Sequence, residues 1–357
     1  MIATLKKHAF KAYKKSTIRK HELNYLFWEC TTKCNLNCLH CGSDCAKDSA
    51  FEDMPIEDFL KAVDTIRNIP ENFTVVFTGG EPLIRNDIEI CGRELRKRGF
   101  KWSLVTNGHL YNKQRHISLL NAGIGALTIS FDGLQESHNW LRNNTHSFTT
   151  VLKAIELAAS SNRINFDVVT CVNQKNFAEL EQIKQLLISK NVKAWRLFTI
   201  IPIGRAVNNP DLHITDAQFL ALMEFIKNSR KTKEIDIKFS CEGYVGRYEL
   251  DVRDSNFFCR AGINIGSVLI DGSISACPNI DRVFSQGNIY THNFYEIWHN
   301  KFQVFRNREW TKVGQCKSCK DYNDCQGNGF HNWHGDHTNV LVCHNEKIKN
   351  AIKHQKR

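Results

Sequence analysis

A short cysteine-rich loop near the start of the chain has the spacing of a metal or cluster site. Cys34, Cys38 and Cys41 are separated by three and then by two residues. Thiolates ligate iron-sulfur clusters, and three of them on one loop can hold three corners of a 4Fe-4S cubane. The fourth iron would then be open to another ligand. Zinc bound by four thiolates, with Cys30 or Cys45 as the fourth, is the alternative that the spacing leaves open.

A second group of cysteines occupies the C-terminal part of the chain. Its members are Cys259, Cys277, Cys316, Cys319, Cys325 and Cys343. The chain has 14 cysteines among 357 residues. Disulfide scaffolds are usually small and secreted, so ligation of metal or iron-sulfur clusters explains this number better. We interpret four other cysteines as non-ligating, with two of them packing as small apolar side chains; the four are Cys30, Cys45, Cys91 and Cys171.

Strands and helices are predicted to alternate through the first two thirds of the chain. The strand patterns lie at 23–29, 73–78, 102–106, 126–131, 166–172 and 194–200, and a helical pattern follows each of these six strands. Repeated strand-then-helix units predict a parallel sheet covered by helices, either open or curled into a barrel. Ligands bind such sheets at the carboxyl ends of the strands.

Polar motifs follow three of these strands, as the cysteine loop follows the first. They are Gly79-Gly80-Glu81-Pro82, then Asn107, then the segment that contains Ser130 and Asp132. All should meet on one face of the sheet. From 231 to 258 the alternation stops, so we expect a polar connector there and a second domain after it.

Composition and charge exclude several classes of protein. With 42% hydrophobic residues the chain is globular rather than disordered, and no apolar run is long enough for a membrane helix. The formal net charge is +11. Basic residues concentrate in an N-terminal arm (1–22) and a C-terminal tail (346–357); solvated helical faces or contact with an acidic peptide or membrane surface explain them.

The cysteine loop and the Gly79–Pro82 motif together resemble the radical S-adenosylmethionine (SAM) superfamily. The resemblance covers roughly 23–230 and implies an α/β fold, a partial (β/α)6 barrel. It implies that the amino and carboxylate groups of SAM occupy the open iron. Gly79, Gly80, Glu81 and Pro82 would hold the methionine amino group of SAM, because glycines permit close approach and a carboxylate complements an ammonium.

Further cofactor contacts follow from the same resemblance. It implies polar contacts to SAM from Asn107, Ser130 and Asp132. Arg142 lies in a stretch similar to the family's HDxxR-type segment, which carries Asn139 in place of the usual Asp. The resemblance makes Arg142 a clamp for the SAM carboxylate, with a surface salt bridge as the alternative. The stretch 201–206 looks like the family's segment near the adenine.

The later cysteines resemble the SPASM domain, a C-terminal iron-sulfur extension of radical enzymes. A hairpin is predicted over 267–276 because its residues alternate around Asp271-Gly272, and it would return Cys277 toward Cys259. The SPASM-like domain is expected over 259–345. By resemblance, a complete set of four cysteines would hold one auxiliary 4Fe-4S cluster; these are Cys316, Cys319, Cys325 and Cys343.

One position departs from the SPASM pattern, because Gly329 stands where a cysteine is expected. Cys259 and Cys277 are therefore short of ligands. Cys241 is one candidate partner, and imidazole can also replace thiolate on iron, which adds three histidines; these are His331, His334 and His337. One or two auxiliary clusters are thus expected, the second being absent, incomplete or assisted by histidine.

The resemblance implies reductive cleavage of SAM to a 5'-deoxyadenosyl radical, which abstracts hydrogen from a peptide or protein side chain. It also implies an external electron donor such as flavodoxin or ferredoxin, and a reducing cytoplasm. A small metabolite is the alternative substrate. A non-catalytic iron-sulfur or zinc protein that binds nucleic acid through its basic ends is disfavoured, because such a protein would not require the ordered motifs at strand ends.

Overall fold

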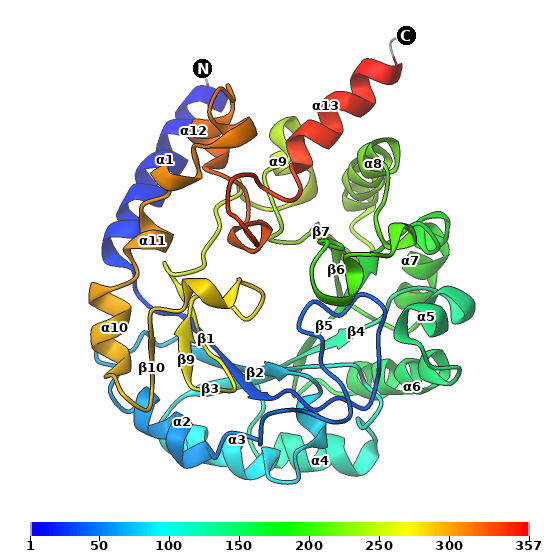
Figure 1. Cartoon of the computed structure of the whole chain (residues 1–357). Coiled ribbons are helices and arrows are strands. Elements are labelled where there is room, and N and C mark those ends of the chain that lie inside the picture. The colour runs from blue at the N-terminus through cyan, green and yellow to red at the C-terminus, as the bar shows by residue number, and fades with distance from the viewer. Residues whose placement is uncertain (1, 356–357) are drawn as a thin grey trace.

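One curved sheet of ten strands organises the chain, and it forms an open, partial barrel with helices outside it (Figure 1). The computed structural model describes residues 2–355. In chain order the strands are β1 (Tyr25–Thr31), β2 (Thr74–Gly79), β3 (Lys101–Thr106), β4 (Ala126–Ser130), β5 (Asn165–Val172), β6 (Ala194–Thr199), β7 (Asp236–Phe239), β8 (Ile265–Val268), β9 (Ser273–Ser275) and β10 (Gly287–Asn288). The order across the sheet is β10-β9-β8-β1-β2-β3-β4-β5-β6-β7.

Strands β1 to β7 run parallel, and helices connect them along the outer face (Figure 1). The helices are α2 (Ile56–Val63), α3 (Ile88–Lys97), α4 (Lys113–Asn121), α5 (Gln135–Arg142), α6 (Ser147–Ala159), α7 (Leu180–Ser189) and α8 (Asp216–Thr232). All six predicted strands are present, which confirms the predicted α/β fold.

Large aromatic side chains fix the helices to the outer face of the sheet. Trp28 of β1 stacks on Phe59 of α2 with ring centroids 4.5 Å apart, and Phe77 of β2 meets Trp28 edge-on. Trp102 of β3 donates its indole N–H to the carbonyl of Ala122 at 3.1 Å. Successive residues of a strand face opposite sides, so the neighbours of these aromatic residues point into the barrel.

The sheet extends beyond the predicted domain boundaries at both of its ends. Residues 231–258, predicted as a polar connector, contain β7, which pairs with β6 from Ala194↔Asp236 to Leu197↔Phe239, and the short helix α9 (Glu249–Val252). At the other end β8 pairs in parallel with β1. The N- and C-terminal parts of the chain therefore share one sheet.

The predicted hairpin is formed by β8 and β9, with a longer turn than the expected two residues. The Gly272 N–H bonds to the carbonyl of Leu269 at 2.9 Å, and Gly272 has φ of +82°, which favours glycine. Four further helices follow: α10 (Phe294–Asn300), α11 (Gln303–Arg306), α12 (Tyr322–Cys325) and α13 (His344–Gln355).

Both basic ends of the chain are helices that pack on the body of the protein. In α1 (Ile2–Lys20), the hydroxyl of Tyr13 accepts from Arg260 at 3.0 Å. In α13, the ammonium of Lys347 pairs with Asp216 of α8 at 3.0 Å. The predicted C-terminal tail is thus part of a docked helix as far as residue 355. None of the helices within residues 2–355 is long and apolar enough to span a membrane.

Candidate active site

The first cysteine loop lines a cavity of about 150 Å³ at the carboxyl ends of the strands. Cys34, Cys38 and Cys41 lie in its wall, and Cys45 lies beside them. Five other predicted residues line the same cavity, namely Gly79, Gly80, Asn107, Ser130 and Arg142. The motifs that follow β1, β2, β3 and β4 therefore meet at one place, as their positions in the sequence predicted.

The spread of the loop thiols fits a cluster better than a single ion. Within residues 2–355, only one group of three possible ligand side chains has its donor atoms all within 4.8 Å, and it is His40, Asp132 and Cys171. The loop cysteines are spaced more widely than that. A zinc ion needs its four ligands close around one centre, whereas a cubane holds its thiolates around several irons. The donor set therefore fits an iron-sulfur cluster.

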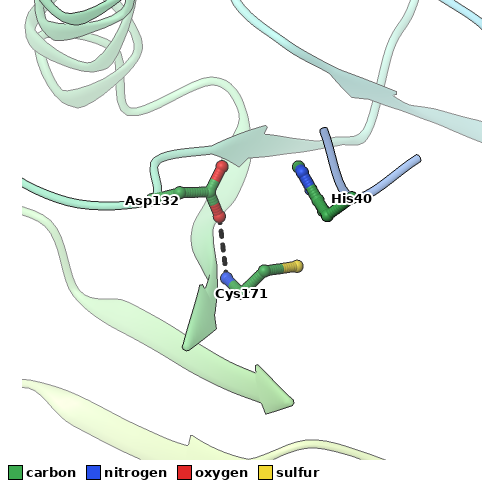
Figure 2. Close-up of side chains that lie close together, drawn as sticks. All are labelled: His40, Asp132 and Cys171. Carbon is green, nitrogen blue, oxygen red and sulfur yellow. Dashed lines mark hydrogen bonds between the residues drawn. The ribbon is translucent and has the colours of Figure 1, made fainter. Parts of the chain in front are cut away.

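His40, which lines this cavity, forms a compact group with Asp132 and Cys171 (Figure 2). Asp132 accepts the backbone N–H of Cys171 at 2.7 Å, the dashed line of Figure 2, and it also pairs with Arg142. Burial raises the pKa of the Cys171 thiol well above its usual range, so the thiol stays protonated. These contacts suit a structural wall rather than a site for a separate metal ion.

Arg142 places a buried positive charge beside the cysteine loop. Its guanidinium lies 3.7 Å from the sulfur of Cys38 and forms an ion pair with Asp132. Both side chains of this pair are buried, so the alternative of a surface salt bridge is wrong. Burial alone would raise the pKa of the Asp132 carboxyl, but the attraction of the Arg142 guanidinium, with help from other neighbouring groups, outweighs it, and the pKa lies below its usual value. A guanidinium in this position can attract a carboxylate or an anionic cluster.

The Glu81 carboxylate is engaged by neighbouring protein groups behind the cavity wall. One oxygen accepts from Leu83 N–H at 3.1 Å and the Thr106 hydroxyl at 2.8 Å, and the other accepts from Asn107 N–H at 2.7 Å. Glu81 is only 1% exposed. Its contacts tie the end of β2 to the end of β3, beside Pro82.

The two glycines of the motif are required by the cysteine loop itself. A Cβ added to Gly79 would lie 1.8 Å from the carbonyl oxygen of Thr31, and one added to Gly80 would lie 2.1 Å from that of Lys33. The Gly80 N–H bonds to Thr31 at 2.8 Å. The sequence predicted that these glycines permit a close backbone approach to SAM. In the structure they permit a close approach to the backbone at and just after the end of β1.

The segment after β6 clamps the other side of the cysteine loop. Arg205 donates from Nε to the carbonyl of Cys38 at 2.8 Å, and its backbone N–H bonds to Cys41 at 3.1 Å. Gly204 has φ of +55° and packs on the same loop. Arg205 and His40 also line the cavity. Arg205 belongs to the stretch 201–206 that was expected near the adenine, whereas His40 was not predicted as a site residue. His40 could have been suspected from its place between two loop cysteines.

A second cavity, of about 210 Å³, is lined by the predicted auxiliary ligands. Cys316, Cys319, Cys325 and Cys343 all contribute to its wall. Cys325 accepts the backbone N–H of Asn328 at 3.1 Å, the kind of hydrogen bond that tunes a cluster sulfur. The four thiols come from separate turns and from the residue just before α13. The structure thus brings together the set that the sequence predicted for one auxiliary cluster.

The other two predicted ligands, Cys259 and Cys277, do not line this cavity. Cys259 accepts the backbone N–H of Phe330 at 3.4 Å, and Cys277 follows β9. Two of the candidate histidines, His334 and His337, face Asp281 at 3.7 and 3.6 Å. Both imidazoles are partly buried beside this carboxylate.

Comparisons with known proteins agree with this geometry. The sequence profile of the radical SAM superfamily matches residues 28–187. The SPASM profile, described as an iron-sulfur cluster-binding domain, matches residues 259–320. The two profiles thus fall on the two groups of cysteines.

Relatives and solved structures match this chain over most of its length. An AdoMet-dependent heme synthase of Oleidesulfovibrio alaskensis is 26% identical over 84% of this chain and 81% of its own. Mycofactocin maturase MftC of Mycobacterium ulcerans is 28% identical over 85% of this chain and 81% of its own.

The structure of anSMEcpe with bound AdoMet and a Cp18Cys peptide has a TM-score of 0.71 and 21% identity, over 94% of this chain and 97% of that one. At that identity the likeness shows the shared fold. SAM and 4Fe-4S clusters are the cofactors of such domains. The chain therefore belongs to the radical SAM superfamily of enzymes and carries a C-terminal SPASM iron-sulfur domain.

Proposed function

We propose that this enzyme abstracts a hydrogen atom from a peptide or protein substrate by radical SAM chemistry. When bound, the cluster and SAM together supply a reductive cleavage that yields methionine and a 5'-deoxyadenosyl radical. The observation that carries the proposal is the cavity shared by the three loop cysteines and the motifs after β2, β3 and β4.

The residues of the cavity divide into ligands, contacts and supports. Cys34, Cys38 and Cys41 hold the cluster, and the cavity wall leaves room beside them for a small cofactor. Ser130 and Arg142 lie where they can bind a carboxylate, and Arg142 carries the positive charge that this needs.

The remaining predicted residues are of two kinds. Asn107 and the backbone of Gly79 and Gly80 line the cavity and can contact the cofactor directly. Glu81 and Asp132 hold parts of the cavity wall in place, because Glu81 joins the ends of β2 and β3 and Asp132 orients Arg142. Pro82 begins the 3-10 turn that presents Leu83 to Glu81.

Two observations support a peptide substrate. The SPASM domain continues the barrel sheet through β8, so its cluster cysteines are held in a fixed relation to the barrel. The structural neighbour anSMEcpe was solved with a peptide bound, and the relative MftC is a maturase. A substrate of that size suits an open barrel with a second domain at its edge.

A tetrapyrrole is the second candidate substrate, because one relative of comparable identity is named a heme synthase. The two candidates can be separated by the basal rate of SAM cleavage. We would measure 5'-deoxyadenosine from the anaerobically reconstituted enzyme with SAM and dithionite, adding either synthetic copies of short peptides encoded beside its gene or iron-coproporphyrin III.

Stimulation by a peptide, with a mass change in that peptide, supports the proposal. Stimulation by the porphyrin alone contradicts the peptide assignment and favours the second candidate. The matched control is Cys38→Ala, which should give no product with either addition because it lacks a proposed ligand of the active-site cluster.

We further propose that flavodoxin or ferredoxin reduces the enzyme, and that it works in the cytoplasm. An open cavity of about 800 Å³ next to Cys34 supports access by an electron donor. Lys33 and Lys47 line it. The Lys33 ammonium already pairs with Glu52 at 3.3 Å, so Lys47 supplies most of the attraction for an acidic protein surface. Replacing both lysines with Gln should slow reduction by flavodoxin and leave reduction by dithionite unchanged.

A further inference from the structure

Three further cysteines, from distant segments of the chain, lie outside both cavities described above. Cys241 follows β7, Cys259 precedes β8, and Cys277 follows β9. The pairing of β9 with β8 at Ser275↔Ser267 returns the chain toward the residues that precede β8, so Cys277 comes back toward the Cys259 segment. Because β7 and β9 lie toward opposite ends of the sheet, this group connects the two ends across the barrel.

The segment of residues 329–331 runs past this group. A Cβ added to Gly329 would lie 2.3 Å from the carbonyl oxygen of Glu242, the residue after Cys241. The next residue, Phe330, donates its backbone N–H to the sulfur of Cys259 at 3.4 Å. Residue 329 is therefore flanked on one side by the Cys241 segment and on the other by Cys259.

The imidazole of His331 occupies the space that a side chain at 329 would need. A Cβ at Gly329 would lie 2.6 Å from Cε1 and 3.1 Å from Nδ1 of His331. A cysteine at 329 and the imidazole in its present place are mutually exclusive. The edge of the ring that carries Nδ1 thus faces the position from which the SPASM pattern would supply a thiolate.

We propose that Cys241, Cys259 and Cys277 hold a second auxiliary 4Fe-4S cluster, with His331 as its fourth ligand in place of a cysteine at 329. The buried guanidinium of Arg253 complements the negative charge of such a cluster, because it lies beside Cys241 and donates to the carbonyl of Gly243 at 3.1 Å. These three thiols are not among the side chains compact enough for a single ion within residues 2–355, as is also true of the loop cysteines.

A histidine ligand in place of a cysteine would change the reduction potential of this cluster. A neutral imidazole in place of an anionic thiolate raises the reduction potential of an iron-sulfur cluster. This auxiliary cluster should therefore accept an electron more readily than one with four thiolates. His331→Cys, which supplies a thiolate from the same position, should lower its potential.

The iron and sulfide content of the reconstituted full-length enzyme tests whether the three cysteines hold a cluster. Three cubanes require about 12 irons per chain. We expect that number for the wild type, about 8 for Cys241→Ser, and about 12 for the matched control Cys91→Ser, whose cysteine is buried in α3. About 8 irons in the wild type, with no change in Cys241→Ser, would overturn the proposal.

Pulsed electron paramagnetic resonance of the reduced enzyme, labelled with ¹⁵N-histidine and free of SAM, tests His331 separately. We expect a nitrogen coupling that His331→Cys abolishes while about 12 irons remain. His334→Ala, the matched histidine control, should keep the coupling. A coupling unchanged in His331→Cys, or its absence from a wild type with about 12 irons, overturns the histidine assignment. Because His331→Cys restores a thiolate, the test does not depend on a variant that loses a ligand.

Discussion

At the scale of single residues, the Glu81 carboxylate acts through the strand ends that it joins. It is buried and accepts from two backbone N–H groups and a hydroxyl. The resemblance to the family placed Glu81 on the SAM amino group, and the charge of a carboxylate suits that contact. Local backbone donors can satisfy the same carboxylate, and only the folded structure shows that they do.

We predict that Glu81→Gln destabilises the fold, because an amide NH2 would replace one acceptor oxygen and leave a buried donor unsatisfied. The expected loss is about 1–3 kcal/mol in the free energy of unfolding, measured by urea denaturation. Glu52→Gln is the control, because the Glu52 side chain is 96% exposed. Unchanged stability together with lost SAM affinity would show instead that Glu81 binds the cofactor directly.

His138 should make the stability of the enzyme depend on pH. Burial lowers the pKa of His138 to about 3, below the usual 6.5, so the imidazole stays neutral in the fold. Its Nδ1 accepts the backbone N–H of Asp132 at 2.9 Å. The unfolded chain binds a proton below pH 6.5 that folded His138 does not bind. The free energy of unfolding must therefore fall as the pH decreases from 6.5 toward 3.

The contribution of this one group is at most about 1.4 kcal/mol per pH unit. We expect urea denaturation at pH 7.5, 6.5 and 5.5 to show a shallower acid loss in His138→Gln than in the wild type. His354→Gln, at an exposed position of α13, should follow the wild type. Parallel pH curves for wild type and His138→Gln would contradict the buried neutral imidazole.

At the scale of elements, the end of β2 determines where the cysteine loop lies. The backbone of Gly80 is so close to Lys33 that a methyl group cannot fit between them. We predict that Gly80→Ala displaces the loop and lowers the iron content by about four per chain. Gly125→Ala is the control, because the nearest atom to its Cβ is 3.6 Å away. Full iron content in Gly80→Ala would contradict this account.

The length of a strand largely determined whether it could be predicted from the sequence. Strands such as β1 and β5 have seven and eight residues, which is long enough for a buried, β-branched or aromatic pattern to be recognised. Strand β7 has only four residues and lies within a charged stretch, so its pairing with β6 depends on tertiary contacts. The parallel pairing of β8 with β1 joins segments more than 200 residues apart, and no local pattern predicts it.

The candidate site likewise contains residues that the sequence predicted and residues that it did not. Residue type and position at the strand ends predicted which side chains surround the cavity, because parallel strands bring their carboxyl ends together. The resemblance placed the stretch that contains Arg205 near the adenine, but residue type and position did not predict that its guanidinium binds carbonyls of the cysteine loop. Nor did they predict that Cys171, interpreted as a packing residue within its strand, lies beside Asp132 at the cavity.

At the scale of the whole molecule, the barrel and the SPASM domain are built around one continuous sheet. Helix α1 packs on the later region through Tyr13 and Arg260, and α13 packs on α8 through Lys347. These contacts fix the cavity of the loop cysteines relative to the cavity of the auxiliary cysteines. The basic ends thereby contribute to assembly of the two domains.

The central claim is that Cys34, Cys38 and Cys41 make this chain a radical SAM enzyme. The most direct test is the anaerobic cleavage of SAM by the reconstituted protein with dithionite, read as 5'-deoxyadenosine. We predict product from the wild type and from Cys91→Ser, and none from Cys34→Ala, Cys38→Ala or Cys41→Ala. Equal amounts of 5'-deoxyadenosine from the wild type and the three loop variants would contradict the claim.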